Sequence, residues 1–203
     1  NEKIRLISHH ENLPEGISDL NIVILFKKER NYLPKNLPLF GLSDSVFKTF
    51  NDRPNLLTKR DIRIQILADL ELPESATLLD IGSGCGTIGL EALRLRPKLK
   101  LISIDKRLGS QLLVKENAKK LGVSPKQIIE SDVKQFLSND LNNIFSNSNR
   151  IVIGGCDKDT KIEIIKVLSE FLKKGDIIVL PLITYEVLQN VSNCLRQLNY
   201  ETS

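Results

Sequence analysis

Short apolar or β-branched runs alternate regularly with amphipathic runs over most of this chain of 203 residues. The apolar runs predict strands at residues 77–81, 99–104, 127–130, 150–153 and 176–182. The amphipathic runs predict helices at residues 86–95, 108–121, 133–137, 159–172 and 184–198. Strands joined through helices pair in parallel, because each helix carries the chain back across the sheet. The predicted fold class is therefore α/β, with a doubly wound, mostly parallel sheet and helices on both faces.

The chain before residue 57 does not follow this alternation. Residues 20–26 form one strand-like run without a core of its own, so residues 1–30 are interpreted as the tail of a preceding domain or an added strand. Pro34 and Pro38 mark residues 31–56 as a linker and lead-in segment. The main domain is predicted at residues 57–203, and it begins with a helix over residues 58–68 for which Thr58 is the expected N-cap.

The chain contains no methionine, even at position 1. We therefore expect it to be a piece of a longer polypeptide. The strand-like residues 199–202 end the chain abruptly, which predicts a fold that is truncated at its C-terminal end.

A glycine-rich turn, Gly82-Ser83-Gly84-Cys85-Gly86, joins the first predicted strand of the sheet to the next helix. Glycines allow positive φ angles and let the backbone approach a ligand closely, and the following helix presents unpaired N–H groups. The third glycine comes one residue earlier than in the G-x-G-x-x-G pattern of dinucleotide-binding loops. This spacing argues against a pyrophosphate ligand.

The strand, turn and helix resemble the cofactor loop of class I (Rossmann-like) methyltransferases. The resemblance implies that the loop packs against the methionine part of S-adenosylmethionine and that an acid at the end of the next strand binds the ribose. Asp105 supplies this acid, and a carboxylate can accept strong hydrogen bonds from both ribose hydroxyls. Asp132 is expected near adenine, although it is also a good helix cap. The expected cofactor residues are Thr58, Asp80, Gly82, Ser83, Gly84, Cys85, Gly86, Asp105, Lys106, Asp132, Val133 and Gly154.

Three further stretches, at residues 41–47, 57–63 and 151–155, narrow the resemblance. They are similar to the decarboxylating precorrin methyltransferases of cobalamin biosynthesis, the CbiT type, which also form the C-terminal half of fused precorrin-6Y C5,15-methyltransferases. Residues 17–25 resemble the closing strand of the C5-methylating domain, so we expect a C5-methyltransferase domain in the same polypeptide. Asp61 and Asp105 stand where the family often has Glu, and residues 156–158 replace a continuation rich in Gly or Ser.

The resemblance implies methylation of C15 of a late precorrin, with loss of carbon dioxide from the C12 acetate. We assign no catalytic residue, since His9 and His10 lie outside the predicted core. The conjugated ring can itself supply the electrons for methyl transfer and accept those released on decarboxylation. Because such a substrate carries many carboxylates, a second hypothesis places four residues against it. These residues are Lys59, Arg60, Arg63 and Gly155, and each cation could equally be a solvated charge.

The sequence also admits two other functions, a tRNA adenosine methyltransferase and a non-catalytic subunit that binds S-adenosylmethionine. Nucleic acid is not expected, because the net charge of +4 is scattered and only 5% of residues are aromatic. No apolar run is long enough to span a membrane, so we expect none. The three well-separated cysteines predict no metal site and a reducing cytoplasm. A homo-oligomer is a further prediction from the family.

Overall fold

The computed structural model describes residue 16 and residues 36–135, 144 and 148–200. The chain divides into two units, Asn1–Asn31 and Tyr32–Ser203, and every helix and strand given below lies in the second. The predicted strand at residues 20–26 and both histidines lie outside the described residues. Within the described residues, no helix has the length and apolar character needed to cross a membrane.

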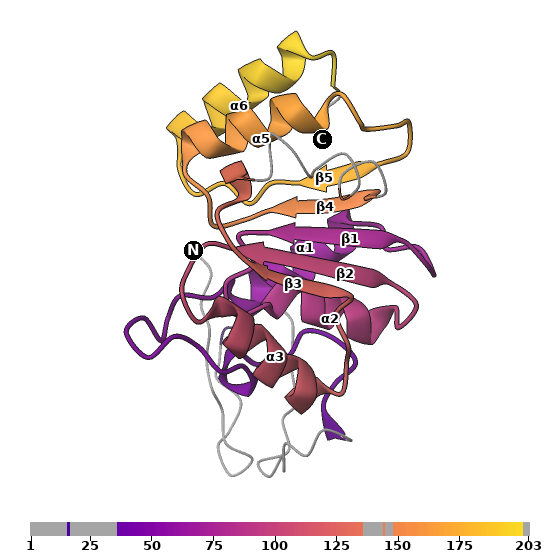
Figure 1. Cartoon of the computed structure of the whole chain (residues 1–203), viewed down its shortest axis with the longest axis vertical. Coiled ribbons are helices and arrows are strands. Elements are labelled where there is room, and N and C mark those ends of the chain that lie inside the picture. Colours follow the sequence, from indigo (N-terminus) through magenta and orange to yellow (C-terminus); the bar gives the residue numbers. More distant parts are fainter. Residues whose placement is uncertain (1–15, 17–35, 136–143, 145–147, 201–203) are drawn as a thin grey trace. The chain divides into compact units, whose positions relative to one another are not determined.

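Five parallel strands form one sheet in the order β3-β2-β1-β4-β5 (Figure 1). The strands are β1 (Thr77–Ile81), β2 (Lys100–Asp105), β3 (Gln127–Glu130), β4 (Arg150–Ile153) and β5 (Ile177–Val179). The strand order reverses between β1 and β4, and open α/β sheets bind ligands outside the carboxyl ends of the strands at such a switch point. The predicted fold class is confirmed, and the last predicted strand was too long.

The main helices are α1 (Arg60–Asp69), α2 (Thr87–Leu95), α3 (Ser110–Leu121), α5 (Lys158–Leu168) and α6 (Tyr185–Gln197). Short 3-10 turns occur at η2 (Asp44–Val46) and η3 (Val133–Gln135). The helix predicted at residues 133–137 is thus a single turn as far as the structure describes it. The helix predicted to reach residue 172 ends at Leu168. The prediction ran too far because Phe171 and Leu172 are apolar and pack on the core from the turn that follows the helix.

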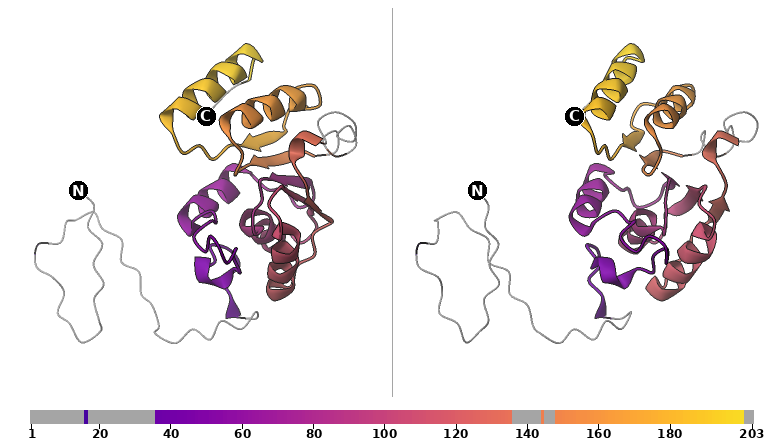
Figure 2. Two further views of the ribbon diagram at one scale, coloured as in Figure 1. Left: turned by 60° about the vertical axis from the view of Figure 1, so that its left-hand side comes forward. Right: turned by 90° about the vertical axis from the view of Figure 1, so that its left-hand side faces the viewer.

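Side chains alternate between the two faces of the sheet and form two separate cores. On β1, Leu78 packs beneath α1, α2 and α3, whereas Leu79 and Ile81 pack beneath α5 and α6. This is the period-two pattern of an extended strand. Figure 2 shows α5 and α6, in orange and yellow, lying side by side and apart from α3. The prediction of helices on both faces is therefore confirmed.

Two sequence predictions at the helix ends are wrong. The N-cap of α1 is Lys59, and it makes no side-chain capping bond, so Thr58 does not cap this helix. The Thr58 carbonyl instead accepts a hydrogen bond from the Arg63 side chain at 2.5 Å. Asn199 lies in a turn after α6 with φ of 59°, so the strand predicted at residues 199–202 does not begin there.

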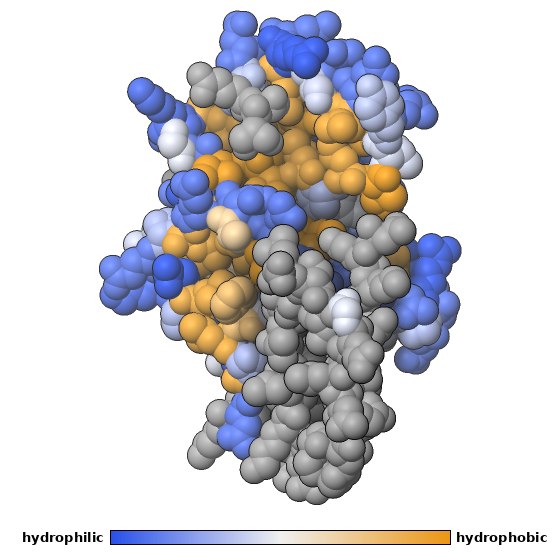
Figure 3. Space-filling view, turned by 180° about the vertical axis from the view of Figure 1, so that it is seen from behind, coloured by the Kyte–Doolittle hydropathy of each residue, from blue (hydrophilic) through white to orange (hydrophobic). Residues whose placement is uncertain are grey.

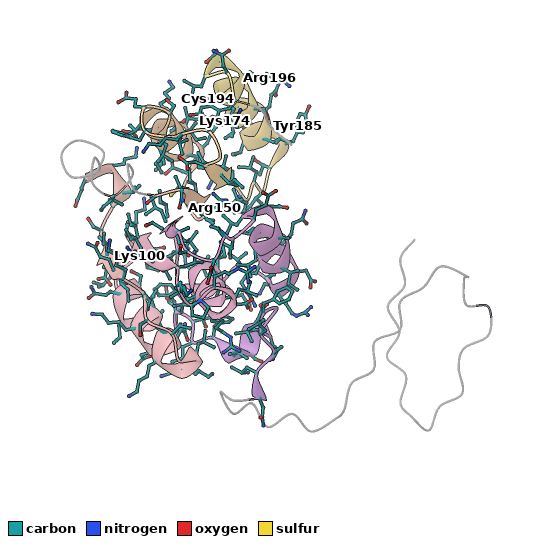
Figure 4. All side chains as sticks on the ribbon, turned by 90° about the vertical axis from the view of Figure 1, so that its right-hand side faces the viewer. Lys100, Arg150, Lys174, Tyr185, Cys194 and Arg196 are labelled. Carbon is teal, nitrogen blue, oxygen red and sulfur yellow. The ribbon has the colours of Figure 1, made fainter. Side chains whose placement is uncertain are left out.

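Some apolar side chains remain on the surface at the beginning of α6. Ile183, Tyr185 and Leu188 are exposed, and β5, next to them in the chain, is only partly covered. Figure 3 shows apolar side chains gathered in the upper part of one face, at the level where Figure 1 places α5, α6 and β5. Figure 4 labels Tyr185 on the outer side of α6. Surfaces of this kind are typical of protein contacts, so the homo-oligomer stays a prediction with a physical basis.

Candidate functional site

The glycine turn after β1 lies against the end of β2. The backbone N–H groups of Gly82 and Ser83 both donate to the Ile104 carbonyl, at 2.8 and 3.2 Å, and Gly86 N–H donates to the Ser83 carbonyl at 2.8 Å. Gly82, Gly84 and Gly86 have φ angles of 72°, 58° and 82°. Because these angles are in the left-handed region, other residues would be strained there. The local fold therefore requires the three glycines that the sequence pattern singled out.

Gly82 and Gly84 have opposite surroundings. A Cβ atom on Gly82 would lie 2.7 Å from the backbone nitrogen of Gly155, in the turn after β4. A Cβ atom on Gly84 would meet no described atom within 4 Å. The turn is thus packed tightly against β4 on one side and open at Gly84, which leaves room for a ligand beside the backbone.

Asp105, at the end of β2, faces this turn. One carboxylate oxygen accepts the Gly84 N–H at 2.7 Å, and the other accepts the Arg107 N–H at 2.8 Å. Each carboxylate oxygen has a second lone pair, so the fixed carboxylate can still accept hydrogen bonds from hydroxyl groups. The structure therefore brings Asp105 and the glycine turn together in the arrangement that the sequence predicted.

Asp80, on β1, forms the buried floor below the turn. Its side chain is 1% exposed, and Oδ2 accepts the Gly89 N–H at 3.2 Å. Oδ1 has no hydrogen-bond partner among the described residues, nor does the hydroxyl of Ser103, its neighbour on β2. Burial raises the pKa of Asp80 to about 7; the Gly89 bond opposes this change, and the charge of Asp105 adds to it. This buried acceptor is available to a donor group or a water molecule.

Lys106, Asp132 and Val133 also come together, at the ends of β2 and β3. The Lys106 ammonium lies 3.8 Å from Asp132 Oδ2, and Val133 is buried. Asp132 Oδ1 accepts the Lys134 N–H at 3.0 Å, as expected of a residue that caps the short turn η3. These side chains therefore lie at the carboxyl ends of β2 and β3, on the side of β1 opposite to β4.

The two cysteines in the loops carry protonated thiols at neutral pH. Burial raises the pKa of Cys85 to about 11. Burial also raises the pKa of Cys156, although the charge of Lys161 opposes this shift. Since the thiolate is the nucleophilic form, neither residue is suited to nucleophilic catalysis, and both are small space-filling groups.

Arg63 was expected to face the substrate, but it lies inside the protein. Its side chain is 0% exposed, and it pairs with Glu91 at 3.1 Å and with Asp44 at 2.7 Å. It also donates to the carbonyl oxygens of Leu42 and Thr58. With these acceptors around the guanidinium group, Arg63 holds residues of the chain itself, and we do not include it among the proposed substrate contacts.

The other predicted substrate residues keep exposed groups. Arg60 donates to the Gly41 carbonyl at 2.8 Å, and its side chain is half exposed. Lys59 lies 4.0 Å from Asp44 and is also half exposed. Gly155 is exposed beside the glycine turn. By contrast, Lys100 and Arg150, labelled in Figure 4, begin β2 and β4 and therefore lie at the opposite edge of the sheet.

Two buried polar residues that the sequence reasoning missed attach the leading segment, residues 36–59, to the cofactor side of the fold. Glu91, on α2, accepts the N–H groups of Gly41 and Leu42 at 2.9 and 3.0 Å. Asn117, on α3, accepts the Lys48 N–H at 2.8 Å and donates to the carbonyls of Lys48 and Cys85 at 2.9 and 3.0 Å. A polar residue inside an apolar helix pattern was the available signal.

The sequence and the fold of this chain are similar to those of known proteins. Residues 48–201 match the model of a family described as precorrin methyltransferase domain. A Saccharolobus solfataricus protein named "Probable cobalt-precorrin-6B C(15)-methyltransferase (decarboxylating)" is 30% identical over 166 residues, which are 81% of this chain and 80% of that protein. A Sulfolobus acidocaldarius protein of the same name is 31% identical over 79% of this chain and 80% of its own length. The crystal structure of a precorrin-6Y C5,15-methyltransferase from Geobacter metallireducens superposes with a TM-score of 0.70 at 25% identity, over 81% of this chain and 83% of that chain.

Proposed function

Since this chain belongs to the precorrin methyltransferase domain family, we propose that it methylates C15 of a late precorrin of the precorrin-6B type and removes the C12 acetate carboxyl as carbon dioxide. The observation that carries the proposal is the family match over residues 48–201. Relatives named for this reaction cover about four fifths of the chain, which adds support. The enzyme class is a methyltransferase that uses S-adenosylmethionine.

The residues at the carboxyl edge fit S-adenosylmethionine. Gly84 offers open space beside the backbone, Asp105 offers a fixed carboxylate for the ribose hydroxyls, and Asp80 offers a buried acceptor. We assign to the same cofactor further residues in the turns that follow β1, β2, β3 and β4, together with Thr58, which precedes α1. They are Thr58, Gly82, Ser83, Cys85, Gly86, Lys106, Asp132, Val133 and Gly154. When bound, S-adenosylmethionine supplies an electrophilic methyl group on a sulfonium centre.

The protein's own part in this proposal is to bind and orient. The glycine turn and Asp105 hold the methyl donor, while Lys59, Arg60 and Gly155 face the acidic groups of the tetrapyrrole. Burial raises the pKa of both Cys85 and Cys156, which disfavours the thiolate, so the proposal gives neither a covalent role. Fixing the donor and the ring carbon in line lowers the entropic part of the barrier in such a reaction. The conjugated ring accepts the electrons released when the carboxyl group leaves.

The test is incubation of the full chain with labelled S-adenosylmethionine and a late precorrin, either free of metal or carrying cobalt. We expect one methyl group to be incorporated for each carbon dioxide released with one of the two substrates. Binding of S-adenosylmethionine without methylation of either ring would contradict the proposed substrate. Absence of cofactor binding in calorimetry would contradict the proposal as a whole.

A further inference from the structure

Lys161, on α5, carries an ammonium group inside the protein. The residue is 5% exposed, and Nζ donates to the carbonyl of Ile153 at 3.1 Å and to the carbonyl of Gly154. No carboxylate oxygen of the described residues lies within 4.0 Å of it. The lysines that do pair with carboxylates have side chains that are 35–70% exposed. A buried charge without a counter-ion is costly, so an apolar side chain would serve stability better.

The position of this ammonium group points to a role other than stability. Ile153 ends β4, and Gly154 begins the turn that packs against Gly82 of the glycine turn. Lys161 therefore lies directly beneath the carboxyl edge of the sheet at the switch point between β1 and β4. This is the place where ligands bind in open α/β sheets.

The peptide bond between Gly154 and Gly155 accepts two hydrogen bonds at its carbonyl oxygen. The Gly154 carbonyl accepts the Cys156 N–H at 2.6 Å as well as the Lys161 ammonium. Hydrogen bonds to a carbonyl polarise the whole peptide unit, so the N–H of the same peptide becomes a stronger donor. That N–H belongs to Gly155, which is exposed, and it has no acceptor among the described residues.

Burial lowers the pKa of Lys161, and the negative charge of Asp157 opposes this shift. The titratable groups that act on Lys161 are Cys156, whose own pKa is raised by burial, and Asp157. The Asp157 carboxylate caps α5 and accepts both the N–H and the hydroxyl of Thr160, at 2.9 and 2.8 Å. The N-terminal end of α5, which carries a partial positive charge, points at the same turn.

We propose that Lys161 is a positioning residue for substrate binding, which orients and polarises the Gly154–Gly155 peptide so that the Gly155 N–H binds a carboxylate of the substrate. This inference rests on the proposed function, because that function supplies a substrate rich in carboxylates. Lys161 does not touch the substrate. It acts through the Gly154 carbonyl.

The experiment compares Lys161→Met, Lys161→Gln and Lys161→Arg in the full chain, with Lys166→Met as a matched control on the exposed side of the same helix. Thermal unfolding and calorimetry with S-adenosylmethionine are measured first, followed by steady-state kinetics with the late precorrin. We expect Lys161→Met to raise KM for the precorrin about tenfold, because the Gly155 N–H is no longer oriented and polarised for the substrate carboxylate. Its kcat and its dissociation constant for S-adenosylmethionine stay within about twofold, because uniform binding alone is lost.

The conservative variants separate positioning from stability. Lys161→Arg keeps the charge and restores KM, and Lys161→Gln, which keeps a donor but no charge, gives an intermediate value. A wild-type KM in both neutral variants overturns the inference, and so does a loss of cofactor affinity as large as the change in KM. If Lys161→Met does not fold, the Gln and Arg variants decide by the same comparison. A wild-type protein that turns over neither precorrin contradicts the proposed function, and the inference fails with it.

Discussion

The carboxylate of Asp80 accepts a hydrogen bond from the backbone N–H of Gly89 at 3.2 Å. Gly89 lies in the first turn of α2, whose N-cap, Gly86, has no side chain. A side chain from strand β1 therefore replaces the usual capping residue, and it does so directly beneath the glycine turn. A Cβ atom on Gly89 would lie 3.1 Å from Asp80 Oδ2 and closer still to Leu101, so a side chain here would force the Leu101 side chain to move.

The burial of Asp80 predicts a dependence of stability on pH. Its pKa rises from 3.8 in the unfolded chain to about 7 in the folded protein. Between these two pH values the folded protein keeps the proton on Asp80, whereas the unfolded chain has lost it. The contribution to stability is full below pH 3.8 and is lost as the pH rises through about 7. Each unit of pKa difference corresponds to about 1.4 kcal/mol.

Asp80→Asn removes this titration. We expect the free energy of unfolding of the wild type to fall, relative to the variant, as the pH rises from about 4 to about 7. Denaturant unfolding of both proteins without cofactor at several pH values measures the difference. Curves that run parallel over this range would show that Asp80 does not carry a raised pKa.

Asp105→Ala is expected to weaken binding of S-adenosylmethionine about 10- to 100-fold, because charge-assisted hydrogen bonds contribute about 1.5–3 kcal/mol. The loss includes the support that the carboxylate gives to the Gly84 N–H. Titration calorimetry measures the dissociation constant. Asp69→Ala, at the exposed end of α1, is the matched control and should bind as the wild type does. Equal affinities of the two variants would remove Asp105 from the site.

Gly82→Ala and Gly84→Ala form a second matched pair. Both residues have positive φ, so each alanine is strained by about 1–2 kcal/mol. Only the Gly82 substitution also places a methyl group 2.7 Å from the Gly155 nitrogen, where backbone would have to move. We expect a clearly larger fall in melting temperature for Gly82→Ala, measured by thermal unfolding without cofactor. Equal falls would mean that the turn after β4 yields easily.

Removing Arg63 should destabilise the protein more than removing Arg60. Arg63→Met leaves Glu91 buried without its cation, and breaking a buried pair costs about 3–5 kcal/mol. Arg60→Met, at a half-exposed position, should cost less than about 1 kcal/mol. Urea unfolding measures both. A stable Arg63→Met variant that binds S-adenosylmethionine normally but has lost affinity for the precorrin would restore Arg63 as a substrate residue.

Local sequence patterns were sufficient to predict most strands of the sheet and the positions of the glycine turn and Asp105. The strands at residues 77–81, 127–130 and 150–153 were predicted to the residue, because their apolar runs are bounded by turn residues. Asp105 could be placed opposite the glycine turn because parallel strands end at the same edge of a sheet. These inferences need only neighbouring residues and one topological rule.

The substrate side depended on contacts between distant residues. Nothing near Arg63 in the sequence indicates that Glu91, 28 positions later, accepts its hydrogen bond inside the protein. In the same way, Lys161 looks like one more cation on an amphipathic helix until the fold places it under the turn after β4. A charged side chain has the same pattern in the sequence whether it is solvated or buried, so only tertiary structure separates the two cases.

The attachment of the leading segment to Glu91 and Asn117 has a consequence for hydrogen exchange. The amides of Gly41, Leu42 and Lys48 lie outside the helices and strands of the structure, and each donates to one of these side chains. Their protons can exchange with solvent only when those bonds open. These amides should therefore exchange as slowly as those of α2 and α3. The leading segment would then open only together with the core.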